Sequence, residues 1–196
     1  MRIVVDTREQ TPLVPWRRAR KGDDPALVTS GAYCLPTVRA ALKAGDYSVE
    51  GLEHVVAVER KSIADLYGTL YGSATNAAGE RAPHLDRFRA ELESLLGHER
   101  RWWLIEGNPS DLDAYMVMNG RRVAPQDAHS LIASIACDYD IPTIWLGPEG
   151  PEARARCGQF LGVVLGRIIE QANDEKAAKK VLERGLSLPW VKVVQL

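Results

Sequence analysis

Two acidic residues and one lysine, Asp46, Glu59 and Lys61, stand where short predicted strands begin or end. Glu59 and Lys61 are two residues apart, so on a strand they face the same side and Arg60 faces the other. Carboxylates are ligands for Mg²⁺, which keeps several waters, can lower the pKa of one of them and neutralises phosphate. A nearby lysine can orient the attacking water or stabilise developing negative charge. These residue types therefore suit hydrolysis of a phosphodiester.

The same pattern also has a purely structural interpretation. Asp46 would cap the turn at Gly45, Glu59 and Lys61 would form a surface ion pair, and Arg60 would be solvated. An isolated acid followed by an E-x-K motif is common, so the structural interpretation is favoured unless the surrounding sequence adds further matches.

The surrounding sequence adds three blocks in a fixed order. Residues 5–9 read VDTRE, residues 42–47 read LKAGDY, and residues 58–62 read VERKS, with Asp65 following at the expected spacing. In order and local spacing the blocks resemble the nuclease domain of the XPF family of structure-selective DNA endonucleases. The signature of that family runs V-D-x-R-E, then G-D, then E-R-K-x-x-x-D.

The resemblance implies an α/β, restriction-endonuclease-like fold, a mixed central sheet flanked by helices that carries a PD-(D/E)XK site. It implies Mg²⁺ as cofactor, with Mn²⁺ able to substitute, and cleavage of DNA at junctions, flaps or forks. Asp46 and Glu59 would be the metal ligands, Lys61 the catalytic lysine and Arg60 a phosphate or structural contact. The other implied members of the site are Asp6, Arg8, Glu9 and Asp65.

Two features depart from the family pattern. Where the family often has R-x-x-x-Q on a helix, this chain has Arg87 followed by Ala90 and Glu91, without the glutamine; Arg87 remains a candidate DNA contact. Residues 150–196 are too few for the paired helix-hairpin-helix module that many members carry, and they lack its G-x-G hairpins. We therefore expect a homodimer to grip the DNA. The C-terminal apolar residues that would form it are Phe160, Leu161, Val163, Val164, Leu165, Ile168 and Ile169.

A basic cluster lies between the first two blocks. Trp16 is followed by Arg17, Arg18, Arg20 and Lys21 within five positions. As a DNA contact, the cluster would neutralise phosphates and Trp16 could stack on an unpaired base. A solvated loop explains the same residues equally well.

Composition predicts an ordinary single domain. The chain has 196 residues, 25 basic and 26 acidic groups and 45% hydrophobic residues, which excludes a strongly basic coat protein or a disordered tail. We expect residues 1–150 to form the nuclease core and residues 151–196 a C-terminal helical extension packed on it. Three distant cysteines favour reduced thiols, and we find no membrane helix or signal peptide. The expected location is the cytoplasm of a bacterium, or of the host of a phage that encodes the protein.

Hydrophobic patterning predicts how the elements follow one another. A strand at 2–6 should precede a long irregular excursion from 7 to about 35. An antiparallel meander should follow, made of strands at 37–42, 46–49 and 54–60. Ser62 and Asp65 resemble a capping box that begins a helix, and the small, polar segment 72–82 should be flexible.

The rest of the chain should alternate between helices and buried strands. Helices are predicted at 83–97, 125–138 and 152–184, the last in two pieces broken near Asn173 and Asp174. Buried strands are predicted at 102–105 and 141–146, and such units imply right-handed parallel crossovers.

Three functions remain open from the sequence alone. The first is an active, metal-dependent endonuclease that cuts branched, flapped or forked DNA. The second is a catalytically silent DNA-binding or scaffolding subunit with the same fold. The third is another nuclease of the superfold, a Holliday-junction resolvase.

Overall fold

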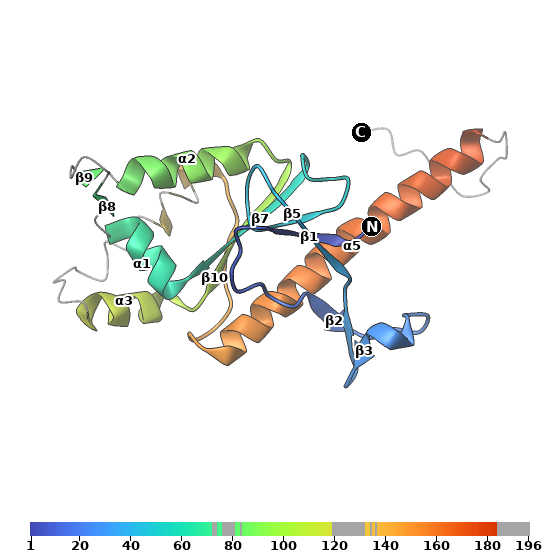
Figure 1. Ribbon diagram of the computed structural model, residues 1–196, viewed down its shortest axis with the longest axis horizontal. Helices are drawn as coiled ribbons and strands as arrows, with labels where there is room; N and C mark the ends of the chain where they lie inside the picture. The colour runs from blue at the N-terminus through green and yellow to red at the C-terminus, as the bar shows by residue number, and fades with distance from the viewer. Residues whose placement is uncertain are drawn as a thin grey trace.

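A computed structural model shows how these segments are arranged (Figure 1). It describes residues 1–71, 74–75, 81–82, 84–118, 132–133, 135 and 137–183. The strands are β1 (Ile3–Asp6), β2 (Trp16–Arg18), β3 (Val28–Thr29), β4 (Ala32–Cys34), β5 (Thr37–Ala40), β6 (Tyr47–Val49), β7 (Val56–Ser62), β8 (Ala74–Thr75), β9 (Arg81–Ala82), β10 (Arg100–Glu106) and β11 (Thr143–Trp145). The helices are the 3₁₀ turn η1 (Pro25–Leu27), α1 (Ile63–Tyr71), α2 (His84–Leu96), α3 (Pro109–Met118) and α5 (Pro151–Glu183).

A six-stranded sheet with the order β11-β10-β7-β6-β1-β5 forms the centre of the described part. β6 pairs antiparallel with both β1 and β7. β1 pairs parallel with β5, and β10 pairs parallel with both β7 and β11. The expected mixed central sheet and its parallel crossovers are confirmed. The predicted meander is confirmed in part: β6 and β7 pair antiparallel, but the strand expected at 37–42 does not pair with β6, because β1 lies between β5 and β6. Alternating apolar residues show which face of a strand is buried, but not which strand lies beside it.

The sheet is covered on both faces. Successive residues of β7 and β10 alternate between two cores: Ala57 and Trp103 contribute to one, and Val58 and Leu104 to the other. Helices α1, α2 and α3 pack on the first face, and α5 crosses the second (Figure 1). This burial on both faces explains why the run predicted at 102–105 is continuously apolar.

The C-terminal helix α5 is one continuous element, so the predicted break near Asn173 and Asp174 is wrong. Asn and Asp cost a helix much less than Pro or Gly, and neither Pro nor Gly stands there. Among the seven apolar residues proposed for dimerisation, only Val163 is exposed, at 47%, because the others face the chain's own core. These residues therefore give a homodimer no support.

The segment predicted as an irregular excursion contains a second sheet, with the order β2-β4-β3. It packs against α5, where Gly158 and Gly162 face the backbone of Val14 and Trp16. A side chain at either glycine would collide with that backbone, so the glycines let β2 approach the helix closely. The prediction failed because these strands have only two or three residues each, too few for a period to show.

Parts of two predicted segments lie outside the described residues. For the helix expected at 125–138, the structure describes only 132–133, 135 and 137–138, all helical. For the segment expected to be flexible, 72–82, it describes only the paired strands β8 and β9. No helix in the described part of the chain combines the length and apolarity that crossing a membrane requires.

Candidate active site

Asp46 directly precedes β6, and backbone hydrogen bonds to the strands on both sides fix its position. Its amide donates to the carbonyl of Val58 at 2.8 Å, and its own carbonyl accepts from the amide of Asp6 at 2.8 Å. Gly45 has φ +73°, and a side chain there would meet the Val58 backbone, so glycine is required at this approach. One Asp46 carboxylate oxygen, Oδ2, accepts from the Arg60 amide at 2.8 Å.

Glu59 and Lys61 lie on one face of β7, as the spacing predicted. The Lys61 ammonium lies 2.9 Å from Glu59 Oε1 and 2.5 Å from Glu91 Oε1 on α2. Glu59 and Lys61 are both largely buried, so the surface ion pair of the structural interpretation does not describe them. Lys61 is held between two carboxylates.

The electrostatics of the site favour uptake of positive charge. Burial raises the pKa of Asp46 to about 6, and the negative charge of Glu9 adds to this effect. Burial also raises the pKa of Glu59 well above its usual range, helped by a hydrogen bond with Glu91 and by the charge of Asp46. Burial alone would lower the pKa of Lys61, but the carboxylates of Glu59 and Glu91 outweigh it and raise that pKa. The positive side chains nearby therefore do not fully offset the cost of burying the negative charges of Asp46 and Glu59.

These side chains line a cavity of about 940 Å³ between the β6–β7 edge and helices α1 and α2. Asp46, Glu59 and Lys61 lie in it with Glu9, Asp65 and Glu91. Among the described residues no group of three or more acidic, histidine or cysteine side chains forms a closed metal-ligand cluster. Two carboxylates facing an open cavity nevertheless fit Mg²⁺, which usually takes one or two protein carboxylates and fills its other positions with water and phosphate.

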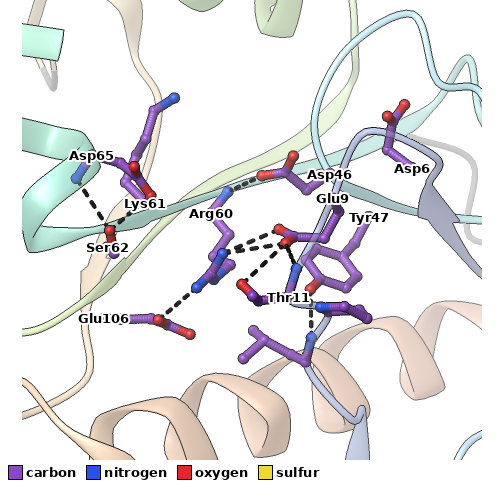
Figure 2. A network of polar contacts seen from close by, with 12 residues as sticks. Asp6, Glu9, Thr11, Asp46, Tyr47, Arg60, Lys61, Ser62, Asp65 and Glu106 are labelled. Atoms are coloured by element: carbon purple, nitrogen blue, oxygen red, sulfur yellow. Dashed lines mark hydrogen bonds and ion pairs between the residues drawn. The ribbon is translucent and has the colours of Figure 1, made fainter. Parts of the chain in front are cut away.

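Arg60 points to the opposite face of β7 from Lys61, as predicted (Figure 2). Its guanidinium lies 3.2 Å from Glu9 Oε2 and 2.8 Å from Glu106 Oε2, and the side chain is 8% exposed. Glu9 also accepts from the amide of Thr11 at 2.8 Å. Arg60 is therefore a buried structural residue, whereas the structural interpretation expected it to be solvated. Glu9 is held in the site by its ion pair with Arg60.

Asp6 does not line the cavity. Its carboxylate accepts from the amide of Leu42 at 2.7 Å, and from the amide and guanidinium of Arg8. The Arg8 guanidinium holds the pKa of Asp6 down at about 2. Asp6 therefore joins the turn before Gly45 to β1, while Arg8, 72% exposed, reaches the rim of the cavity.

The structure describes the side chain of Asp65 but not that of Arg87. Asp65 lines the cavity, and its amide donates to the Ser62 hydroxyl at 3.1 Å while that hydroxyl donates to its carboxylate at 2.7 Å. This is the helix start that the Ser62 and Asp65 pattern predicted. The backbone of Arg87 lies in α2, but its side chain lies outside the described residues.

Some residues of the basic cluster at 16–21 are held by contacts within the protein, and others are exposed. Arg17 is buried, makes a two-pronged ion pair with Asp23 at 2.8 and 2.9 Å, and stacks over Tyr33. Arg20 pairs with Glu170 at 2.9 Å, and the Trp16 indole donates to the carbonyl of Ala155 at 3.1 Å. Arg18, Arg20 and Lys21 are exposed.

Three residues of the site and its surroundings were missed from the sequence. Glu91 stands where the family often has glutamine, and that departure was the available signal. Glu106 ends the buried strand β10, a position where an acid needs a partner, and its partners are Arg60 and Arg154. Lys43 lines the cavity and is exposed. It immediately precedes Ala44 and the G-D block, and no pattern distinguished it from a solvated lysine.

Comparison with known proteins decides the family. The model of the ERCC4 domain matches residues 5–149, which is most of the chain. The chain belongs to the ERCC4-domain family. The matched range contains every block of the XPF-like signature, so the resemblance seen in the sequence is confirmed, and α5 begins just after this ERCC4 domain. No curated protein sequence matches the chain.

Two solved structures share the fold of this ERCC4 domain. The XPF protein from Aeropyrum pernix is 21% identical with a TM-score of 0.52, over 84% of this chain and 61% of that one. The same XPF in complex with DNA is 20% identical with a TM-score of 0.51, over 85% of this chain and 65% of that one. The chain therefore spans less than two thirds of the length of either XPF chain.

The raised pKa of Asp46 predicts how stability depends on pH without metal. An aspartate normally titrates near 3.8, so the folded protein binds a proton more tightly than the unfolded chain and gains stability as pH falls towards 6. We expect Asp46 to contribute about 1 kcal/mol to a gain in the free energy of unfolding between pH 7.5 and 5.5, measured with urea in EDTA, and the raised pKa of Glu59 contributes in the same direction. Asp46→Asn should remove the contribution of Asp46 to this gain.

Asp6 affects stability in the opposite direction, and it does so in a separate, more acidic pH range. Its lowered pKa stabilises the fold above about pH 4, and this stability is lost as pH falls towards 2. A stability that stays flat or falls between pH 7.5 and 5.5 would contradict the assignment of Asp46 as a buried acid whose charge is not fully offset.

Proposed function

We propose that this chain is a metal-dependent DNA endonuclease that hydrolyses phosphodiester bonds in branched, flapped or forked DNA, in repair or recombination. The observation that carries the proposal is the meeting of Asp46, Glu59 and Lys61 in one cavity of an ERCC4 domain. The likeness in fold to an XPF protein solved with DNA supports DNA as the substrate.

Each residue of the cavity has a chemical task in this proposal. A Mg²⁺ or Mn²⁺ ion held by Asp46 and Glu59 would supply positive charge to the phosphate and lower the pKa of a water. Lys61 orients the attacking water and stabilises the charge that develops on the phosphate. Glu91 gives Lys61 a second partner, which would hold the ammonium in place if Glu59 bound a cation.

Exposed cations on the cavity rim and on the smaller sheet would contact the DNA backbone. Arg8 and Lys43 lie on the cavity rim, and Arg18 and Lys21 are exposed on the smaller sheet and the turn after it. Because phosphate contacts position DNA without reading its sequence, these residues suit recognition of DNA shape. Arg17 is left out of this set, because its guanidinium is buried against Asp23.

A panel of end-labelled flap, fork, four-way junction, single-strand and duplex DNAs tests the function. We expect cleavage of flaps and forks with Mg²⁺ or Mn²⁺, and none in EDTA. Cleavage confined to four-way junctions would identify a resolvase instead. Binding without cleavage of any DNA would identify a silent subunit, and calorimetry with Mn²⁺ would then show whether Asp46 still supports metal binding.

Lys43 gives a prediction about DNA affinity. Lys43→Ala should weaken binding of a fork several-fold and reduce the slope of log K against log salt by about one, the loss of one phosphate contact. Binding is measured by fluorescence anisotropy without divalent metal, so that cleavage does not interfere. Lys179→Ala, an exposed lysine near the C-terminal end of α5, is the matched control. An unchanged salt slope in Lys43→Ala would remove Lys43 from the DNA interface.

A further inference from the structure

The segment that follows β1 carries Glu9 into the site, yet it has no regular structure between Asp6 and Trp16. Such a segment keeps one conformation only if other elements hold it. Arg39 of β5 donates to the carbonyls of Asp6 and Glu9 at 2.9 and 2.7 Å, and the Tyr47 hydroxyl accepts from the amide of Leu13 at 2.7 Å. These contacts fix its two ends.

The middle of the segment is held from the C-terminal helix. Arg154, in the first turn of α5, donates from one guanidinium nitrogen to the carbonyls of both Thr11 and Pro12, the latter at 3.0 Å. Its other terminal nitrogen lies 3.3 Å from Glu106 Oε1. A planar guanidinium can make such contacts in fixed directions, which a lysine ammonium cannot do.

Glu106 connects Arg154 to the site. Its second oxygen accepts from Arg60 at 2.8 Å, and the same guanidinium pairs with Glu9. The backbone of Arg60 donates to the carboxylate of Asp46. An unbroken series of polar contacts therefore runs from α5 through Glu106 and Arg60 to a proposed metal ligand, and Arg154 also holds the backbone two residues beyond Glu9.

We propose that Arg154 is a positioning residue, through which α5 holds the Glu9 segment and the Arg60 guanidinium in the geometry that cleavage needs. The inference rests on the proposed function for the reaction it serves. Arg154 lies outside the matched range 5–149, so the family match itself assigns it no role. On this account α5 is part of the catalytic architecture, as well as a cover for the second core.

Arg154 can be removed without leaving a buried charge alone. The side chain is 38% exposed, so water can reach the freed carbonyls, and Glu106 keeps its ion pair with Arg60. Arg154→Ala should therefore fold. Arg156→Ala is the matched control, because Arg156 lies two residues further along α5 and pairs only with the exposed Glu152 among the described residues.

Hydrogen exchange of the full chain, without DNA or metal, tests the contact directly. In Arg154→Ala, amides in peptides covering residues 8–14 should exchange roughly tenfold faster than in the wild type, while peptides of β7 and β10 stay unchanged. Arg154→Lys should give an intermediate rate, and Arg156→Ala the wild-type rate. Unchanged exchange in Arg154→Ala would overturn the proposal, whatever the activity of the protein.

Cleavage kinetics then test whether positioning matters for the reaction. Arg154→Ala should lower kcat roughly ten- to a hundredfold with KM for the DNA within about twofold, because misplaced groups slow the chemical step more than binding. Faster exchange with an unchanged kcat would overturn the catalytic role. A wild-type protein that cleaves no DNA would refute the proposed function, and the exchange result would still decide whether Arg154 holds the segment.

Discussion

Glu59→Gln should abolish cleavage of branched DNA, with a fall in rate of about 10³-fold or more, because it removes one of two carboxylates that would hold the metal. Glutamine keeps the shape of the side chain and a carbonyl oxygen for Lys61, whose ammonium lies 2.9 Å from Glu59 Oε1. It also removes a buried negative charge whose pKa is raised by burial. The stability of the metal-free protein should therefore not fall, and single-turnover cleavage with Mg²⁺ measures the loss.

Two comparisons make the result specific to the site. Glu99→Gln changes an exposed glutamate in the turn before β10, and it should cleave like the wild type. DNA binding by Glu59→Gln, measured by anisotropy, should persist. If Glu59→Gln retained more than a tenth of wild-type activity, Glu59 would not be a ligand of the catalytic metal.

Replacing Arg60 by methionine should produce the largest loss of stability, about 3–5 kcal/mol in the free energy of unfolding. Arg60 is the partner of both Glu9 and Glu106, and all three side chains are largely buried. The change leaves Glu9 without its ion pair and Glu106 with only the longer contact to Arg154, at 3.3 Å, in a poorly hydrated place. Urea unfolding at pH 7.5 measures the effect, and Arg60→Lys should retain part of the stability because it keeps the charge.

The matched control for Arg60 is another arginine–glutamate pair. Arg2 and Glu50 are joined at 2.6 Å but both are well exposed, so Arg2→Met should change stability little. Adding Glu9→Gln to Arg60→Met should recover part of the loss, because one unpaired charge disappears. Equal effects of Arg60→Met and Arg2→Met would show that the buried network does not stabilise the fold.

The sequence predicted those parts of the fold that depend on local pattern. The start of α1 at Ser62 and Asp65, and the buried strand β10, follow from residues adjacent in the chain. The position of β1 between β5 and β6 could not be predicted this way, because strand pairing is decided by contacts between distant segments. The small sheet from 16 to 34 was missed because its strands are too short to show a period.

The candidate site was predictable where residues share a strand or a family block. Period-2 alternation placed Glu59 and Lys61 on one face and Arg60 on the other, and the structure shows that arrangement. The partners of these residues come from α2 and from the end of β10, and no local pattern connects Glu91 or Glu106 with β7. The separate tasks of acids in the same block also depend on tertiary contacts. Asp6 is withdrawn from the cavity by Leu42 and Arg8, whereas Glu9 lines it.

The most direct test of the central claim is single-turnover cleavage of one end-labelled forked DNA by the wild type and by Asp46→Asn, each with Mg²⁺ and with EDTA. The account predicts a defined cut near the junction by the wild type with Mg²⁺ alone, and no cut by Asp46→Asn in either condition. Cleavage by the wild type in EDTA, or equal cleavage by Asp46→Asn with Mg²⁺, would contradict a metal-dependent endonuclease site built on Asp46 and Glu59.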